Sequence, residues 1–198
     1  KPDIVQANYP CASVYPTAKE LLASGKVELV VITAPNDLHF SLATLCIEHK
    51  LHVVLEKPMA TSSEEAQALV DLAKRHSVLL SVFHNRRWDG DFLSAKSIIE
   101  QQRLGTVRFF ESHFDRFRPL VRQRWKEEPG PGSGIWFDLG SHLLDQAVCL
   151  FGEPISLTAR CLATREQAKT TDYFHVQLHY KELEVVLHGS CYSASPNV

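Results

Sequence analysis

The first half of the chain alternates short apolar runs with longer segments in which apolar residues recur every three or four positions. Continuous apolar runs of this kind are typical of strands buried on both faces of a parallel sheet. They are Leu29–Thr33, His52–Leu55 and Val78–Phe83. The longer segments predict helices from about His39 to His49 and from the capping box Thr61-Ser62-Ser63-Glu64 to about His76. This alternation predicts βαβ units and a doubly wound parallel sheet, an α/β fold.

The pattern changes after Gly105. A half-buried strand is predicted from Val107 to Arg118, and a loop rich in Arg, Pro and Gly follows, before a helix that begins near Gly134. Three further strands then come in succession: Ile155–Ala163, Tyr173–Tyr180 and Leu183–Tyr192. Successive strands predict a second, α+β domain with an open mixed or antiparallel sheet. We therefore expect a boundary near Gly105-Thr106, which gives domains of residues 1–105 and 106–198.

Composition excludes several classes of function. The 198 residues are 44% hydrophobic and 22% charged, and the formal net charge is −2. This charge gives no electrostatic reason to expect nucleic acid or an anionic membrane as a partner. No apolar run approaches the ~20 residues that a membrane-spanning helix requires. Five dispersed cysteines without a Cys-x-x-Cys pair favour reduced core thiols in a cytoplasmic protein over disulfides or a zinc site.

The most informative segment is Gly134–Asp145, which follows a turn rich in Gly, Pro and Ser. On a helix, Asp138 and His142 lie four residues apart on one face, and a carboxylate beside an imidazole can form a general base. Gly140 is a poor helix former, which indicates that something approaches the backbone closely there. The surrounding apolar residues predict a mostly buried helix, where charged groups need a partner or a function. The alternative is an exposed Asp/His pair without function.

Three polar clusters follow the predicted strands, at the carboxyl ends where open α/β sheets bind ligands. They are Pro35–His39, Glu56–Pro58 and His84–Trp88. Polar residues are ordinary in loops, so each cluster alone is weak evidence. Lys57 is the most informative member, because it lies between a buried strand and a proline that fixes the backbone, and the Lys57-Pro58 bond is a candidate for the cis form.

In combination these motifs are specific. Glu56-Lys57-Pro58 follows the second predicted strand, and Gly-x-x-x-Asp-x-Gly-x-His follows about 80 residues later. Together with Pro35-Asn36-x-x-His39 and Asn85-Arg86-Arg87, this order resembles the glucose–fructose oxidoreductase / inositol dehydrogenase (Gfo/Idh/MocA) family over essentially the whole chain. The family often has three glycines where this chain has Gly132-Ser133-Gly134, and we expect little effect from this small serine.

The resemblance implies an NAD(P)-dependent dehydrogenase that acts on a sugar, an inositol or a related polyol, with NAD or NADP as cofactor. It implies a partial Rossmann domain followed by a domain for substrate binding and oligomerisation, and hence a homodimer or larger homo-oligomer. The family's glycine-rich phosphate-binding loop would precede Lys1. The chain begins without an initiator Met and stops directly after a strand-like run, so we interpret it as a fragment of a longer protein.

Carried over by position, the family's catalytic residues are Lys57, Asp138 and His142. The resemblance implies that His142 acts as the base, that Lys57 stabilises charge on the substrate oxygen, and that Asp138 orients the substrate or the imidazole. The residues expected on the cofactor side are Pro35, Asn36, His39, Glu56, Lys57 and Asn85. The residues expected to bind substrate are Lys57, Asn85, Arg116, Trp125, Asp138 and His142.

Arginines crowd the strand and loop before the catalytic helix, at positions 116, 118, 122 and 124. If two of them face the pocket, they favour a polyhydroxy or acidic substrate. The alternative is a solvated surface or a subunit contact.

Two other functions remain open from the sequence. One is a non-catalytic regulator or sensor that keeps the cofactor site. The other is a metal-dependent hydrolase with Asp138, His142 and Asp145 as ligands. We expect no metal ion, because no other His/Asp cluster lies nearby in the sequence.

Overall fold

The computed structural model describes residues 2–194, with side chains described from residue 4 onward. The chain forms two compact units, one up to Val82 and one from Phe83 onward. None of the helices in this described part has the length and apolar character needed to cross a lipid bilayer.

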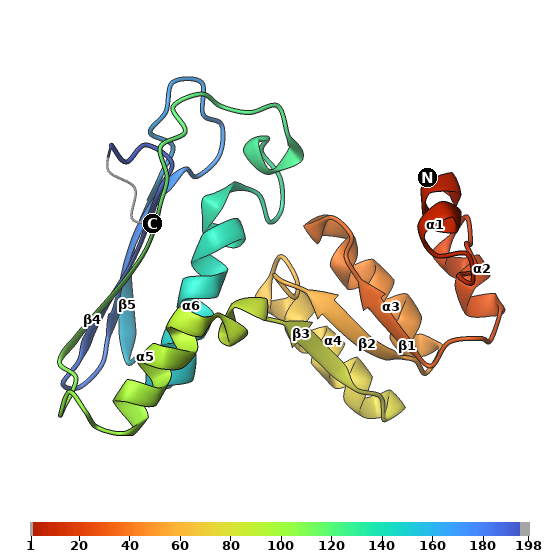
Figure 1. Cartoon of the computed structure of the whole chain (residues 1–198), viewed down its shortest axis with the longest axis horizontal. Coiled ribbons are helices and arrows are strands. Elements are labelled where there is room, and N and C mark those ends of the chain that lie inside the picture. Colours follow the sequence, from red (N-terminus) through yellow and green to blue (C-terminus); the bar gives the residue numbers. More distant parts are fainter. Residues whose placement is uncertain (1, 195–198) are drawn as a thin grey trace. The chain divides into compact units, whose positions relative to one another are not determined.

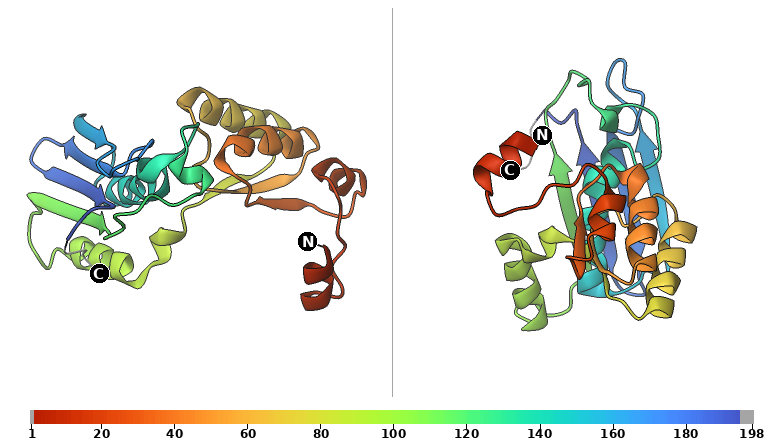
Figure 2. Two further views of the ribbon diagram at one scale, coloured as in Figure 1. Left: turned by 90° about the horizontal axis from the view of Figure 1, so that it is seen from above. Right: turned by 90° about the vertical axis from the view of Figure 1, so that its right-hand side faces the viewer.

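The first unit is a βαβαβ arrangement. Its helices are α1 (Pro2–Asn8), α2 (Ala18–Ala23), α3 (His39–Glu48) and α4 (Ser63–His76), and its strands are β1 (Leu29–Ile32), β2 (His52–Glu56) and β3 (Leu80–Phe83). The sheet order is β1-β2-β3, and β1 and β2 are parallel. Helices α3 and α4 lie on the same face of this sheet (Figure 2). This βαβαβ arrangement is Rossmann-like and corresponds to half of a doubly wound sheet, which confirms the predicted class.

The buried apolar positions explain why these segments pair. Val53 and Leu55 of β2 are fully buried, and they pack with Ile47 of α3 and Leu69 of α4 in one core cluster. Because side chains of a strand alternate between its two faces, β2 buries every second residue against the helices.

The start of α4 differs by one residue from the predicted capping box. Ser62, not Thr61, is the N-cap, and its hydroxyl accepts a hydrogen bond from the backbone N–H of Glu65. The Glu65 carboxylate in turn accepts from the backbone N–H and hydroxyl of Thr61. The box therefore uses Glu65 instead of Glu64, because Thr61 and Ser62 are both suitable N-caps and each has a glutamate three residues later.

The second unit is built on a four-stranded mixed sheet. Its helices are α5 (Gly90–Glu100) and α6 (Ser141–Phe151), and its strands are β4 (Phe109–Asp115), β5 (Ser156–Leu162), β6 (Tyr173–His179) and β7 (Glu184–Ser190). The order is β4-β7-β6-β5, with β4 parallel to β7 and the other pairs antiparallel. The predicted open mixed sheet is confirmed, whereas helix α5 was not expected from the sequence pattern.

Helix α6 packs along one face of this sheet (Figure 1). Phe174, Val176 and Leu178 alternate along β6 and are buried with Leu143 and Ala147 of α6 in one core cluster. The side chains between them on β6 point to the opposite face. One face of the sheet therefore holds the core, and the other carries mostly polar residues.

The two units divide earlier than the boundary expected at Gly105-Thr106. Residues 83–105 belong to the second unit. The reason is visible at Arg86, whose guanidinium lies 5.0 Å from the centroid of the Phe114 ring of β4. The backbone carbonyl of Arg86 also accepts a hydrogen bond from Gln146 of α6.

All five cysteines are free thiols, as predicted. The prediction that they are core residues holds for Cys46 and Cys191 only. Cys11, Cys149 and Cys161 are exposed. Dispersed spacing favours free thiols but does not by itself tell which side of an element a cysteine occupies.

Candidate active site

In the first unit, two of the predicted polar clusters follow adjacent strands. Pro35 and Asn36 lie in a short turn between β1 and α3, and Glu56 and Lys57 lie at the end of β2. Since β1 and β2 are parallel and adjacent, these turns lie at the same edge of the sheet. The Lys57-Pro58 peptide bond is cis, as the sequence allowed.

His39 connects these two turns. Its imidazole is fully buried, with Nδ1 2.7 Å from the Pro58 carbonyl oxygen and Nε2 2.9 Å from the Ala34 carbonyl oxygen. From the family resemblance, His39 was expected on the cofactor side. In the structure both ring nitrogens face backbone carbonyls, so His39 fixes the position of the turn that carries Lys57.

The third cluster belongs to the second unit and anchors Asp145. Asn85 is exposed in the turn after β3. Arg87 donates to both carboxylate oxygens of Asp145, at 2.8 Å and 2.6 Å. This hydrogen bonding raises the pKa of Arg87. Because Arg87 holds both oxygens, Asp145 is a structural ion-pair partner and not a free ligand.

Asp138 and His142 lie in two consecutive segments of an unusual helix start. Trp136–Gly140 forms a π-helical turn, and α6 begins at Ser141, whereas the sequence predicted one continuous α-helix. A π turn contains an extra residue and is frequent at functional sites. Asp138 lies within this turn, and the buried His142 lies in the first turn of α6.

The packing of Trp136 explains the turn. A Cβ on Gly140 would overlap the Trp136 ring, and that ring makes an edge contact with Phe174, 5.3 Å between centroids. A Cβ on Gly189 would likewise overlap the Phe174 ring. The predicted close approach to Gly140 is thus made by Trp136, not by a ligand.

Replacing Gly140 with Ala is expected to destabilise the protein by about 1–3 kcal/mol through overpacking against Trp136. Helix propensity alone would favour Ala by about 1 kcal/mol, so the sign of the effect separates the two influences. Gly90→Ala is the matched control, because a Cβ at the start of α5 meets nothing within 4 Å. Urea unfolding of both variants measures the difference, and a stable Gly140→Ala protein would contradict this account of the turn.

Asp138 has a partner that the sequence did not indicate. The Lys126 ammonium lies 2.5 Å from Asp138 Oδ1. Lys126 also lies 5.6 Å from the centroid of the Trp125 ring. One general rule pointed to such a partner, namely that a half-buried carboxylate needs a cation. It could not select Lys126, because several arginines nearby in the sequence were equally suitable partners for Asp138.

The predicted arginine cluster exists. The pKa of Arg118 is lowered, mainly by partial burial and to a smaller extent by repulsion from Arg116, Arg122 and Arg124. Arg116 is half-buried, and Trp125 is 45% exposed. The loop is therefore a concentration of positive charge directly before the turn that carries Asp138.

A buried ionic network fixes this loop. Arg165, nearly inaccessible, donates to Asp172 at 2.8 Å and to Glu127 at 2.6 Å. Its guanidinium also donates to the carbonyl oxygens of Arg118 and Leu120. The hairpin between β5 and β6 thereby holds the arginine-rich loop in place.

Removing one member of this network should cost stability. Burial acts to raise the pKa of Asp172, but hydrogen bonds from Arg165 and Thr164 outweigh it and hold that pKa below the ordinary value. The stabilisation is therefore full above the unfolded-state pKa of about 3.9 and is lost as the pH falls through the lower folded-state pKa. Asp172→Asn should cost about 3–5 kcal/mol at pH 7, because it leaves buried charge uncompensated.

In Asp172→Asn, the free energy of unfolding should also fall less between pH 7 and pH 3 than in the wild type. Denaturant unfolding over this pH range would measure the difference. Glu128→Gln is the control. Glu128 pairs with Lys169, but both side chains are more than half exposed, so we expect a change within about 1 kcal/mol. Equal losses in the two variants would show that burial of the network is not what stabilises the loop.

The metal-dependent hydrolase has no support in the geometry. Among residues with described side chains, Asp138, His142 and Asp145 do not form a group able to hold a metal ion. The predicted catalytic residues divide between the units: Lys57 belongs to the first, and Asp138 and His142 belong to the second.

Comparison with known proteins agrees with this reading. Residues 3–84 match the oxidoreductase family with an NAD-binding Rossmann fold, and residues 92–197 match the GFO/IDH/MocA C-terminal domain. Together, the two matches place the chain in the class of oxidoreductases with an NAD-binding domain. The chain belongs to the GFO/IDH/MocA family, and the predicted family and the predicted cofactor, NAD or NADP, are confirmed.

Individual relatives are similar over nearly the whole chain. The uncharacterised oxidoreductase YdgJ of Escherichia coli (strain K12) is 49% identical over 96% of this chain and 55% of its own length. The scyllo-inositol 2-dehydrogenase (NADP(+)) IolW of Bacillus subtilis (strain 168) is 42% identical over 93% of this chain and 52% of its own length. The structure of yvaA from Bacillus subtilis superposes with a TM-score of 0.95 at 40% identity, covering 98% of this chain and 56% of yvaA. The chain thus spans about half the length of these relatives.

Proposed function

We propose that the full-length protein transfers a hydride between NAD or NADP and a secondary alcohol of a sugar, an inositol or a related polyol. The observation that carries this proposal is the set of Lys57 after β2 with Asp138 and the buried His142 around the π turn. Similarity to a scyllo-inositol dehydrogenase supports the substrate class.

The described residues fit a nicotinamide cofactor. Half-exposed Asn36 and Glu56 and the exposed Pro35 follow β1 and β2, at the edge where parallel sheets bind nucleotides. When bound, NAD(P) supplies the hydride acceptor for alcohol oxidation. In this proposal, His39 positions the Lys57 turn without contacting the cofactor, and Asn85 lies between cofactor and substrate.

The chain's own residues would handle the proton. In our proposal, the His142 imidazole accepts the hydroxyl proton as the carbinol hydrogen leaves as hydride, and the alcohol becomes a carbonyl. The Lys57 ammonium stabilises the negative charge that develops on the substrate oxygen. Asp138, held by Lys126, orients the substrate or the imidazole.

The arginine-rich loop would contribute to substrate binding. Positive charge from Arg116 and its neighbours, with the exposed face of Trp125, suits a polyhydroxy or anionic sugar. Cytoplasmic location and a homo-oligomeric state stay predictions of the sequence.

A substrate panel tests this proposal. Sugars, inositols and polyols are offered to the full-length protein with NAD and with NADP, and turnover is followed by nicotinamide absorbance. Turnover of at least one alcohol is expected. Quenching of nicotinamide fluorescence by a ligand without turnover of any alcohol would favour the sensor instead. Activity that a chelator abolishes and that needs no NAD(P) would contradict both.

A further inference from the structure

A cluster of ligand-type side chains lies on the face of the β4-β7-β6-β5 sheet that the core does not use. Along β4, Phe110 and Phe114 pack against the core cluster. Glu111, His113 and Asp115 alternate with them and therefore point to the other face. This face has no role in the proposed dehydrogenase chemistry.

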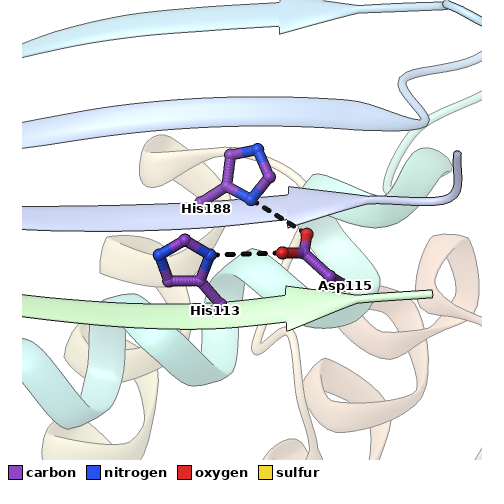
Figure 3. Close-up of side chains that lie close together, drawn as sticks. All are labelled: His113, Asp115 and His188. Atoms are coloured by element: carbon purple, nitrogen blue, oxygen red, sulfur yellow. Dashed lines mark hydrogen bonds and ion pairs between the residues drawn. The ribbon is translucent and has the colours of Figure 1, made fainter. Parts of the chain in front are cut away.

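Strand register brings a second histidine to the same place. His113 of β4 is the direct partner of His188 of β7, and parallel pairing puts their side chains on the same face. Figure 3 shows both imidazoles turned towards the Asp115 carboxylate. Asp115 Oδ2 lies 3.2 Å from His113 Nδ1, and Asp115 Oδ1 lies 2.9 Å from His188 Nδ1 but is not aligned with it as a hydrogen bond.

We propose that His113, Asp115 and His188 bind a divalent transition-metal ion of the zinc class. One ligand atom from each residue lies within 4.8 Å of the others. Imidazole nitrogen and carboxylate oxygen are ligands that zinc accepts at about 2.0–2.2 Å, so small side-chain rotations suffice to close around an ion. Three protein ligands leave a fourth position for water.

A neighbouring carboxylate already orients one ligand. His113 Nε2 lies 2.8 Å from Glu111 Oε1, which leaves Nδ1 directed at Asp115. Metal-bound histidines usually donate their other ring N–H to a carboxylate, and this contact fixes the ring and strengthens the ligand.

The three side chains of the cluster are partly to mostly buried. The side chains of His113 and His188 are 25% and 18% exposed, whereas that of Asp115 is 7% exposed.

The ion would join two strands. Among the described strands, β4 lies at an edge of the sheet and pairs with β7 alone, and the arginine-rich loop follows it. A metal bridge between β4 and β7 would strengthen the attachment of this edge. Because binding to the folded state alone stabilises it, saturating zinc should raise the melting temperature by a few degrees.

The test uses untagged full-length protein, stripped of metal with a chelator and titrated with Zn²⁺ alone in a calorimeter. We expect one ion per chain from this cluster. Co²⁺, as a spectroscopic substitute, should give the visible absorption of a four-coordinate site. His188→Ala and Asp115→Asn should each weaken zinc binding at least 100-fold. Glu111→Gln, which removes no ligand, should weaken it about 10–100-fold.

His179→Ala is the matched control. His179 Nδ1 also lies 2.8 Å from a carboxylate, that of Glu184, on the same sheet, but among the described side chains no third ligand joins the pair. Zinc affinity should not change in this variant. Circular dichroism in chelator shows whether each variant folds, and Glu111→Gln, at a position about half exposed, keeps the test informative if His188→Ala does not fold. Absence of stoichiometric binding, or equal affinity in wild type, His188→Ala and Glu111→Gln, would overturn the proposal.

Discussion

The variant His142→Gln is expected to lower kcat of the full-length protein by about 10²–10⁴-fold with its best alcohol substrate. Glutamine has hydrogen-bonding atoms but cannot accept the hydroxyl proton as imidazole does. His142 is only 7% exposed, so a much smaller residue would leave a cavity. Glutamine keeps most of the volume of histidine and avoids this. Steady-state kinetics over a range of pH measures the effect, and the acid limb caused by a protonated imidazole should disappear.

Binding of NAD(P) should persist in His142→Gln, as judged by nicotinamide fluorescence, since in our proposal the residue touches the substrate. His179→Gln on β6 is the control, because it removes a partly exposed imidazole from the same unit. A His142→Gln enzyme with a near-wild-type rate and an unchanged pH profile would refute the assigned role.

Lys57→Met is the second large effect that we expect. Loss of the ammonium removes a donor to the developing oxyanion, so kcat/KM should fall about 10²–10³-fold. Methionine retains much of the length of the lysine stem, and the His39 contacts that hold the turn involve only backbone carbonyls. The fold should therefore be preserved, which circular dichroism and thermal unfolding can verify.

Lys57→Arg should restore only part of the rate, because a planar guanidinium cannot occupy the place of a compact ammonium. The control is Lys74→Met, an exposed lysine in the last turn of α4. Lys74→Met should retain turnover. If Lys57→Met retained it as well, the reaction would not depend on the residue after β2, and the proposed mechanism would be wrong.

The combination of motifs, not any single motif, identified this chain. Lys57 stands out because an unusual backbone position, between a buried strand and a proline, is visible in the sequence. Asp138 and His142 stand out because a glycine interrupts a largely apolar helix. His39 belongs to the same pattern, but only the structure shows that its two nitrogens face the carbonyls of Ala34 and Pro58.

The sequence by itself determined the strands, most of the helices and the two kinds of sheet. The expected strand Tyr173–Tyr180 became Tyr173–His179, and His52–Leu55 became His52–Glu56. Such segments are predictable because the spacing of apolar residues along one segment decides which side chains it can bury. The one-residue shift at Ser62 marks the limit, since neighbouring polar residues offer equivalent caps.

Only the tertiary structure decided which distant residues meet. The π turn forms because Trp136 packs between Gly140 and Phe174, and Lys126 reaches Asp138 from an irregular loop. Arg165 joins Asp172 to Glu127, and strand register aligns His113 with His188. Local periodicity cannot specify these contacts, because they depend on how strands far apart in the chain pair and on which side chains the packed core leaves room for.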